Sequence, residues 1–324
     1  MKKHGFTGAF FWAVFFIFFP VFVHAADEGI TASTDLVFQA SSRPEAKIGI
    51  TQSFIFPFLQ GRGPLTSGNN IRTNLTVEVS PISLIGIGQL IWTPIAFLEI
   101  NGGGRLGSGW NMALGDGIGI NRPVGDPGSG PGPDGARKAE IDGNAFDGIQ
   151  WSAWIGGAFQ FDLAALFPGP WNHVVFRAQY DLRYSAYTRA GNNDSWVFEN
   201  DREYMNGWTM HPTMVFGYQM PLSPVLDFVG FMAEGDFNLY NIPGKEAWGG
   251  NLGRWTLSSV FNFSFTPQFS TMFAIQLRTK RNFMHTDFDN KDEYWYQDLK
   301  ISNHYGNQRL LFHRVALAAN LKIR

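Results

Sequence analysis

The sequence predicts an all-β protein, an antiparallel up-and-down transmembrane β-barrel of about ten strands, with about twelve as the alternative count. Three observations lead to this fold class. Polar and apolar residues alternate along the chain, the alternating segments are long, and short proline-bearing turns alternate with long polar loops. Because successive side chains of a strand point to opposite faces, each such segment has one apolar and one polar face.

The composition is unusual for a soluble protein of 324 residues. Aromatic residues make up 16% of the chain and charged residues also 16%, against about 25% charged in ordinary soluble domains. The mean hydropathy is −0.11, the near-neutral average that alternation produces. A net charge of −2 gives no reason to expect a nucleic-acid partner. The absence of cysteine excludes disulfides, cysteine-based zinc sites and thiol nucleophiles.

The first 25 residues have the pattern of a cleaved secretory signal peptide. Lys2 and Lys3 are followed by an apolar run from Gly8 to Val23, and Ala25 stands where a signal peptidase would cut. The run is shorter than the roughly 20 residues that a spanning helix needs, which argues against an uncleaved anchor. Residues 26–45 are then expected to form a flexible periplasmic lead-in, and 46–324 the barrel.

The first part of the expected barrel contains three strands. The segment 46–58 alternates, and 70–93 is interpreted as one long strand with a kink at Pro81. Residues 95–107 form the third. If Pro81 instead marks a turn and 108–120 is a further strand, the total becomes about twelve.

The second part follows a long segment rich in glycine, proline and aspartate. Residues 115–147 contain little apolar material and are expected to form an outer loop, which could fold inward and narrow the lumen. After it, the alternation predicts seven strands: 147–163, 173–187, 204–220, 225–240, 253–266, 268–283 and 308–324. Their long loops all fall at one rim and their tight turns at the other, as in transmembrane barrels.

Aromatic residues gather near the expected strand ends. Amphipathic rings suit the headgroup boundary, so this group is interpreted as aromatic girdles. Its members are Trp196, Tyr204, Trp208, Trp248, Trp255, Tyr294, Trp295 and Tyr296.

The polar faces of the strands would line the lumen with charges of both signs. Such charges either interlock and fill a narrow barrel or line a pathway whose basic residues favour anionic solutes. The expected lumen-lining residues are Arg72, Glu78, Asp162, Arg177, Asp181, Arg183, His211, Glu234, Asp236, Arg254, Arg278, Lys280 and Arg314.

A hydrolase needs a base that is oriented beside its nucleophile or its attacking water, and one loop of the chain offers candidates for such a site. His285, Asp287 and Asp289 could share one face of a continued strand, as in an omptin-like protease site. No convincing acidic cluster faces them: Asp194, Glu199, Asp201 and Glu203 are interpreted as ordinary loop acids. The spacing of the His and Asp residues fits no standard metal site. The glycine-rich segments do not lie between a strand and a helix, so they do not indicate a nucleotide-binding loop. We therefore expect no enzyme, no metal and no cofactor.

By its signal peptide, alternating strands, aromatic content and amphipathic last strand, the chain resembles porin-like outer-membrane β-barrels of Gram-negative bacteria. The resemblance implies a place in the cell outer membrane, contact with its lipid, and assembly by periplasmic chaperones and the barrel-insertion machinery. It departs from the usual terminal aromatic residue, since the sequence ends with Ile323-Arg324. The expected function is a porin or narrow channel for small solutes. A structural or surface-interaction barrel with a plugged lumen and a membrane-embedded hydrolase are the alternatives, and a homo-oligomer is left open.

Overall fold

The computed structural model describes residues 29–43, 45–113, 115–126, 137–191, 194–199, 203–219, 223–239, 253–281, 296–297 and 308–323. The expected signal peptide lies outside these residues. Within them, no helix is long and apolar enough to cross a membrane.

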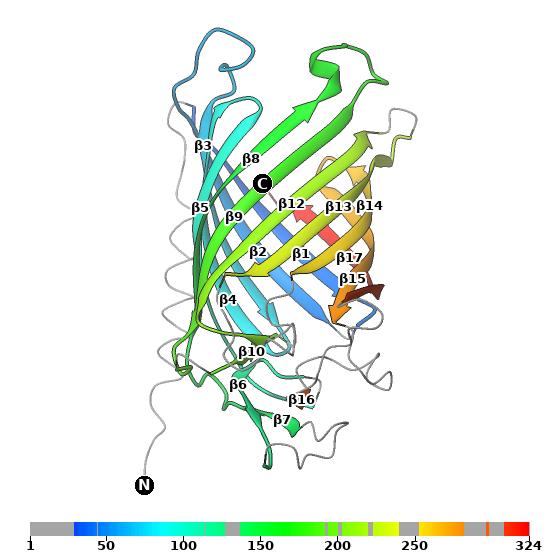
Figure 1. The fold of residues 1–324 in the computed structure, drawn as a ribbon. Coiled ribbons are helices and arrows are strands. Elements are labelled where there is room, and N and C mark those ends of the chain that lie inside the picture. The colour runs from blue at the N-terminus through cyan, green and yellow to red at the C-terminus, as the bar shows by residue number, and fades with distance from the viewer. Residues whose placement is uncertain are drawn as a thin grey trace.

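Twelve of the described strands pair antiparallel and close into one barrel (Figure 1). β17 pairs with β15 along one edge and with β1 along the other. This last pairing closes the ring, so the barrel sheet has no free edge. The barrel strands are β1 (Thr31–Ser41), β2 (Ala46–Pro57), β3 (Asn70–Ser80), β4 (Ser83–Ile95), β5 (Leu98–Gly109), β8 (Gln150–Asp162), β9 (Val174–Tyr187), β12 (Gly207–Gln219), β13 (Leu226–Asn238), β14 (Arg254–Thr266), β15 (Phe269–Arg281) and β17 (Gln308–Lys322).

The strand count of about ten was too low, for two local reasons. Residues 31–41, expected in the flexible lead-in 26–45, form β1, so the barrel begins before residue 46. Pro81 and Ile82 form a tight turn between β3 and β4 and do not kink a single strand, and the hydroxyls of Ser80 and Ser83 lie 2.7 Å apart across it. Proline has no N–H for a ladder, so it suits the turn.

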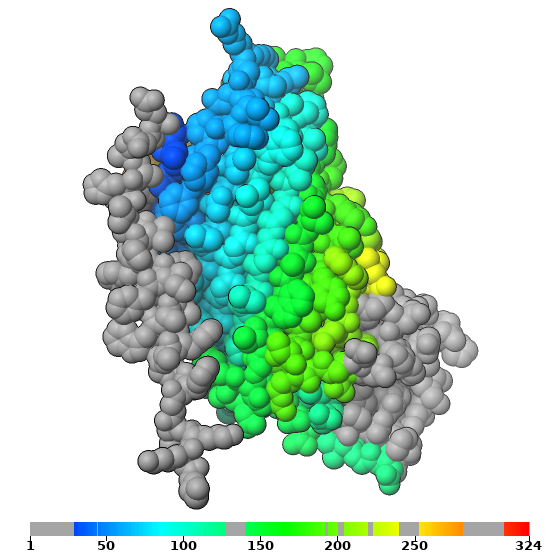
Figure 2. Space-filling model, turned by 90° about the vertical axis from the view of Figure 1, so that its left-hand side faces the viewer, coloured from blue at the N-terminus to red at the C-terminus, as the bar shows by residue number. Residues whose placement is uncertain are grey.

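The barrel is apolar outside and polar inside. Ile155 and Phe231 are 63% and 66% exposed on the outer register, whereas polar Thr256 and Ser258 are 7% and 3% exposed on the inner register. Figure 2 shows the outer wall of the first half of the chain as a continuous surface of neighbouring strands. This arrangement reverses that of a soluble protein and is the one a barrel needs in lipid.

Aromatic pairs lie on the outer register near both ends of the barrel. Toward the rim with the longer connections, Tyr184 contacts Trp151 and Trp208 at 5.4 and 5.3 Å between ring centroids. Toward the other rim, Phe265 stacks on Phe269 at 5.7 Å. From Trp255 to Phe265, ten residues at about 3.3 Å each and a tilt of about 40° span about 25 Å across the membrane. That height matches the apolar band of a transmembrane barrel.

Three members of the expected girdle, Trp196, Tyr204 and Tyr296, lie in a second, small sheet and not on the barrel wall. Trp196 is 1% exposed and stacks on Tyr204 at a centroid distance of 4.9 Å. Trp196 and Tyr204 both lie in the connection between β9 and β12. They pack against each other there and do not lie at the membrane boundary. Trp248, Tyr294 and Trp295 lie outside the described residues.

A second, small sheet lies at the rim that carries the longer connections (Figure 1, bottom). The expected loop 115–147 contributes two of its strands, so this segment is not entirely irregular. The strand order is β11 (Glu203–Tyr204), β10 (Trp196–Phe198), β6 (Ile118–Pro123), β7 (Arg137–Asp142) and β16 (Tyr296–Gln297). We call this the loop sheet.

Candidate functional site

The lumen is the candidate site, and strand register defines which side chains face it. Directly paired residues of neighbouring strands share a face, and the pairs can be followed around the whole ring, with a register shift in four of the strand pairs. They place all the expected lumen residues on the inner register, namely Arg72, Glu78, Asp162, Arg177, Asp181, Arg183, His211, Glu234, Asp236, Arg254, Arg278, Lys280 and Arg314.

One side of the lumen, from β3 to β9, is filled by an interlocked polar network. Glu99 of β5 is buried and accepts Arg177 at 2.7 Å, with Arg72 at 3.6 Å. Asn101 donates to Asp181 at 3.1 Å. These contacts join three strands, β3, β5 and β9, and hold polar and charged side chains against one another. On this side the charged side chains interlock across the inner face of the wall.

Some expected lumen residues stabilise the rims. Asp162, at the end of β8, receives the backbone N–H of Ala164 at 2.9 Å and pairs with His173 Nδ1 at 2.8 Å. It therefore fixes the connection between β8 and β9. At the other end, Arg314 contacts Glu45 in the turn between β1 and β2.

Other expected lumen residues form cross-strand pairs on the opposite side of the ring. Asp236 of β13 lies 3.2 Å from Arg254 and 3.4 Å from His211 Nδ1. Arg278 donates to Thr256 Oγ1 at 3.1 Å. These pairs lie toward the rim that carries the loop sheet. The middle of this wall has smaller side chains.

The loop sheet packs into the barrel mouth. Ile85, on the inner register of β4, is 1% exposed and belongs to one buried cluster with Ile118, Trp196 and Phe198 of the loop sheet. The guanidinium of Arg105 lies 4.9 Å from the centre of the Phe198 ring. These contacts form a small hydrophobic core between the loop sheet and the barrel wall. The loop sheet therefore folds into the barrel and covers part of its mouth. The interpretation that the 115–147 segment could fold inward agrees with this placement.

Glu199 fastens the loop sheet to the barrel wall. Its carboxylate accepts Ser83 Oγ at 2.6 Å and Arg105 at 2.9 Å, and Lys47 Nζ lies 3.2 Å away. Lys47 also pairs with Glu78, at 3.1 Å. Burial would raise the pKa of Glu199, but Lys47, Arg105 and the Ser83 hydroxyl outweigh it and hold the pKa below its ordinary value. The carboxylate is therefore charged at neutral pH and bridges three barrel strands.

Sequence reasoning grouped Glu199 with ordinary loop acids, and this was wrong. The signal that could have found it is the run Trp196-Val197-Phe198 directly before it, in an otherwise polar connection. Three consecutive apolar residues in a loop need something to pack against. In this barrel they pack against the mouth, and the next residue then faces the cations of the wall.

The other side of the lumen is hollow. A cavity of about 560 Å³ lies between the loop sheet and the wall formed by β1, β13, β14, β15 and β17. Small side chains on that wall, including Ala274, Ala316 and Ala318, leave the space. Its charged lining consists of Arg43, Lys47, Arg105, Arg278 and Arg314 with Glu45, Glu199 and Glu234. We call it the outer chamber.

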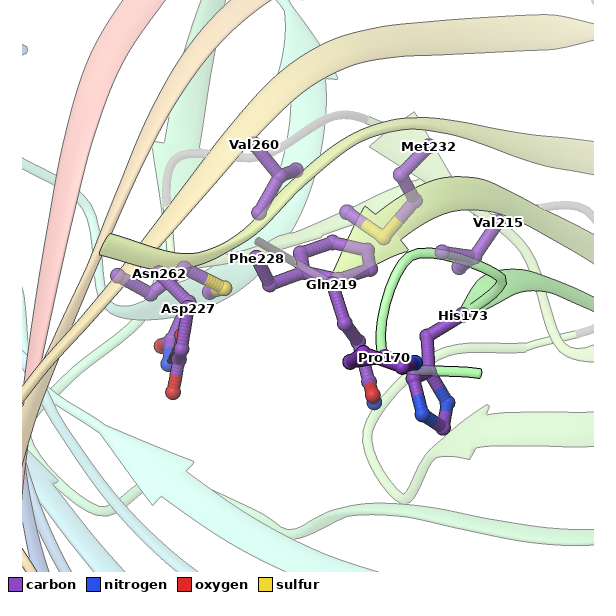
Figure 3. Close-up of a pocket in the computed structure, with 10 residues that line it drawn as sticks. Pro170, His173, Val215, Gln219, Asp227, Phe228, Met232, Val260 and Asn262 are labelled. Carbon is purple, nitrogen blue, oxygen red and sulfur yellow. Dashed lines mark hydrogen bonds between the residues drawn. The ribbon is translucent and has the colours of Figure 1, made fainter. Parts of the chain in front are cut away.

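A second cavity, of about 810 Å³, lies toward the rim where the chain termini of the barrel meet (Figure 3). Met232, Val260 and Met272 line both cavities, so the two adjoin. We call the second cavity the inner chamber. Together the chambers follow the hollow wall past the filled side of the lumen.

The residues of the expected hydrolase site cannot be placed. His285, Asp287 and Asp289 all lie outside the described residues. In the part of the chain that the structure describes, no group of three or more His, Asp or Glu side chains could hold a metal ion.

The closed ring and its apolar outer face define a transmembrane β-barrel, with the architecture of bacterial outer-membrane barrels. Among solved structures, the β domain of the Bordetella autotransporter BrkA is similar over 90% of this chain and 98% of that chain, at 11% identity and a TM-score of 0.37. OccD3 (OpdP) and OprD of Pseudomonas aeruginosa are similar over 92% of this chain and 92% and 96% of theirs, each at 9% identity, with TM-scores of 0.28 and 0.26. No protein-family model matches the sequence, and no curated protein matches it.

Proposed function

We propose that the protein is an outer-membrane channel of narrow bore, through which small solutes pass along the hollow side of the lumen. The observation that carries the proposal is the pair of adjoining chambers, which share Met232, Val260 and Met272. A barrel built only for rigidity has no need of small side chains such as Ala274 and Ala318 along one wall. The proposal includes no catalytic step and no cofactor.

The proposed orientation places the loop sheet outside the cell. Both ends of the barrel chain and the tight turns between β4 and β5 and between β14 and β15 then lie on the periplasmic side, where bacterial barrels carry their short turns. The inner chamber would open toward the periplasm, and the outer chamber would open beside the loop sheet. Outer-membrane lipid, periplasmic chaperones and the insertion machinery are the partners that this location requires.

A second candidate is a surface or structural barrel whose lumen is closed by the loop sheet. The observation in its favour is the bridge from Glu199 to Lys47, Ser83 and Arg105, which fixes the loop sheet in the mouth. In this case the outer loops would perform the function, and the chambers would be packing voids with no role in transport.

Single-channel recording in planar bilayers separates the two candidates. The channel predicts steady ion steps for the wild-type protein, and Ala318→Trp, on the inner register of the hollow wall, should reduce each step. Ala319→Trp, on the outer register of the same strand, is the matched control and should leave the steps unchanged. A silent wild-type barrel that is correctly folded would contradict the channel and favour the closed barrel.

A further inference from the structure

Apolar side chains occupy the inner register at one level of the hollow wall. They come from four neighbouring strands, β12 to β15, and all line the inner chamber. The members are Val215, Phe228, Met232, Val260 and Met272, and we call them the apolar belt. The lumen of a transmembrane barrel is normally polar, so a belt of this kind is out of place unless something apolar contacts it.

Met272 is the exposed member of the belt, whereas Val260 is only 7% exposed. Met272 is 40% exposed, and its paired neighbours Asn262 and Ala318 place it on the inner register. Among the described barrel strands, every other large apolar side chain with comparable exposure lies on the outer register, toward lipid. Ile85, also apolar and inward, is covered by the loop sheet. Met272 therefore exposes apolar surface to the lumen.

The backbone is shaped to hold the Phe228 ring flat against the wall. A Cβ atom at Gly217 would lie 2.2 Å from this ring, and one at Gly230 would lie 2.7 Å from it. The two glycines are directly paired across β12 and β13. Because neither has a side chain, the ring lies over them and keeps out of the chamber, to which it presents a face. Ring face and methionine thioethers are favourable surfaces for an apolar or aromatic body.

Hydrogen-bonding groups lie at one side of the same chamber. The Asp227 carboxylate accepts Asn262 Nδ2 at 2.7 Å and Ser264 Oγ at 2.5 Å, which holds it in place. In Figure 3 the polar ends of Asp227, Gln219 and His173 point away from Met232 and Val260. The chamber thus has an apolar side and a polar side, with a fixed carboxylate that can accept a further hydrogen bond.

From this geometry we propose that the inner chamber is a binding site for a small amphipathic solute, with an aromatic or aliphatic body and one amine or hydroxyl group. The body lies against the apolar belt, and the donating group meets Asp227. A volume of about 810 Å³ is within the usual range for small-molecule sites, which are mostly apolar with a few placed polar groups. The inference rests on the proposed channel only for the route by which the solute arrives.

Equilibrium binding tests the site without requiring conduction. Isothermal titration calorimetry would use phenethylamine on the folded full-length protein in lipid nanodiscs, with empty nanodiscs subtracted. Ethylamine, which has the amine but no ring, is the probe control. The Met232→Asn/Met272→Asn double variant removes the exposed part of the belt, and Val37→Asn makes the same kind of change on the inner register outside the chamber.

The site predicts that phenethylamine binds the wild type at least about tenfold more tightly than ethylamine, and that the double variant loses about tenfold in affinity. Val37→Asn should bind like the wild type. Gly217→Ala, which forces the Phe228 ring into the chamber, should weaken binding while leaving the belt residues intact. Heat-dependent gel mobility establishes that each variant is folded. Equal affinity for the two amines, or unchanged binding by the folded double variant, would overturn the site. A silent bilayer recording would overturn the channel alone.

Discussion

Neutralising Glu199 should release the loop sheet from the barrel mouth. In Glu199→Gln the side chain keeps its size and can still bond Ser83, but the charge that faces Lys47 and Arg105 is lost. Breaking a buried pair typically costs about 3–5 kcal/mol. The loss here is smaller, about 2 kcal/mol, because Lys47 keeps Glu78 and both cations are 24% exposed. A change of about 2 kcal/mol raises the open population about thirtyfold.

Cysteine labelling measures this opening, since the chain has no cysteine of its own. Ile85→Cys places a thiol under the loop sheet, at a position that is 1% exposed. When opening and closing are fast, the labelling rate by a soluble maleimide follows the open population. Glu199→Gln should therefore accelerate labelling about thirtyfold.

The matched control is Asp194→Asn, which removes another carboxylate of the same connection. Asp194 accepts only a local bond from the Gly191 N–H, at 3.0 Å, among the contacts described for it. Its removal should change the labelling rate less than about twofold. Labelling of Glu199→Gln at the wild-type rate, with the barrel still folded, would refute the bridge as the fastening of the loop sheet.

Three further results are expected. Trp196→Ala should destabilise the loop sheet by about 3–5 kcal/mol, seen as faster proteolysis after Arg189, while the barrel keeps its heat-dependent gel mobility; unchanged proteolysis would argue against the buried core. Phe231→Arg, on the lipid face near mid-strand, should cost about 2–4 kcal/mol in folding titrations into liposomes, whereas Gln39→Arg on the inner register should cost little; equal costs would contradict the assigned faces. Because the pKa of Glu199 is depressed, its stabilisation is complete above the ordinary value of 4.5 and is lost as the pH falls below it. Hydrogen exchange of the β10 amides, corrected for intrinsic rates, should rise in that acidic window in the wild type and stay flat in Glu199→Gln.

Period-two alternation was sufficient to place most of the barrel strands. From residue 147 onward the seven expected strands correspond to seven observed barrel strands, with ends that differ by up to three residues. β1 was missed because its outer face carries small or polar residues such as Ala32 and Thr34, which weaken the alternation. Pro81 was misread because the alternation continues on both sides of the turn, so periodicity alone cannot show that the chain reverses there.

The sequence was sufficient to predict which side chains face the lumen, but not what the lumen does. Register follows from alternation, so residues such as Arg177 and Asp236 could be assigned to the inner face. The hollow wall could not be foreseen, because it depends on which strands become neighbours and on small residues gathering along one side. The docking of the loop sheet is a tertiary contact between segments as distant as Ser83 and Glu199. No local pattern encodes such a contact.

The account depends most on lipid meeting one register of each strand and water meeting the other. Single nitroxide labels at successive positions 71–79 of β3, in the reconstituted protein, test this directly. We expect oxygen to relax labels best at odd positions, beginning with Ile71, and a water-soluble nickel chelate to relax those at even positions, beginning with Arg72. If accessibility to both agents changes smoothly along the strand without a period of two, the barrel described here does not span a membrane.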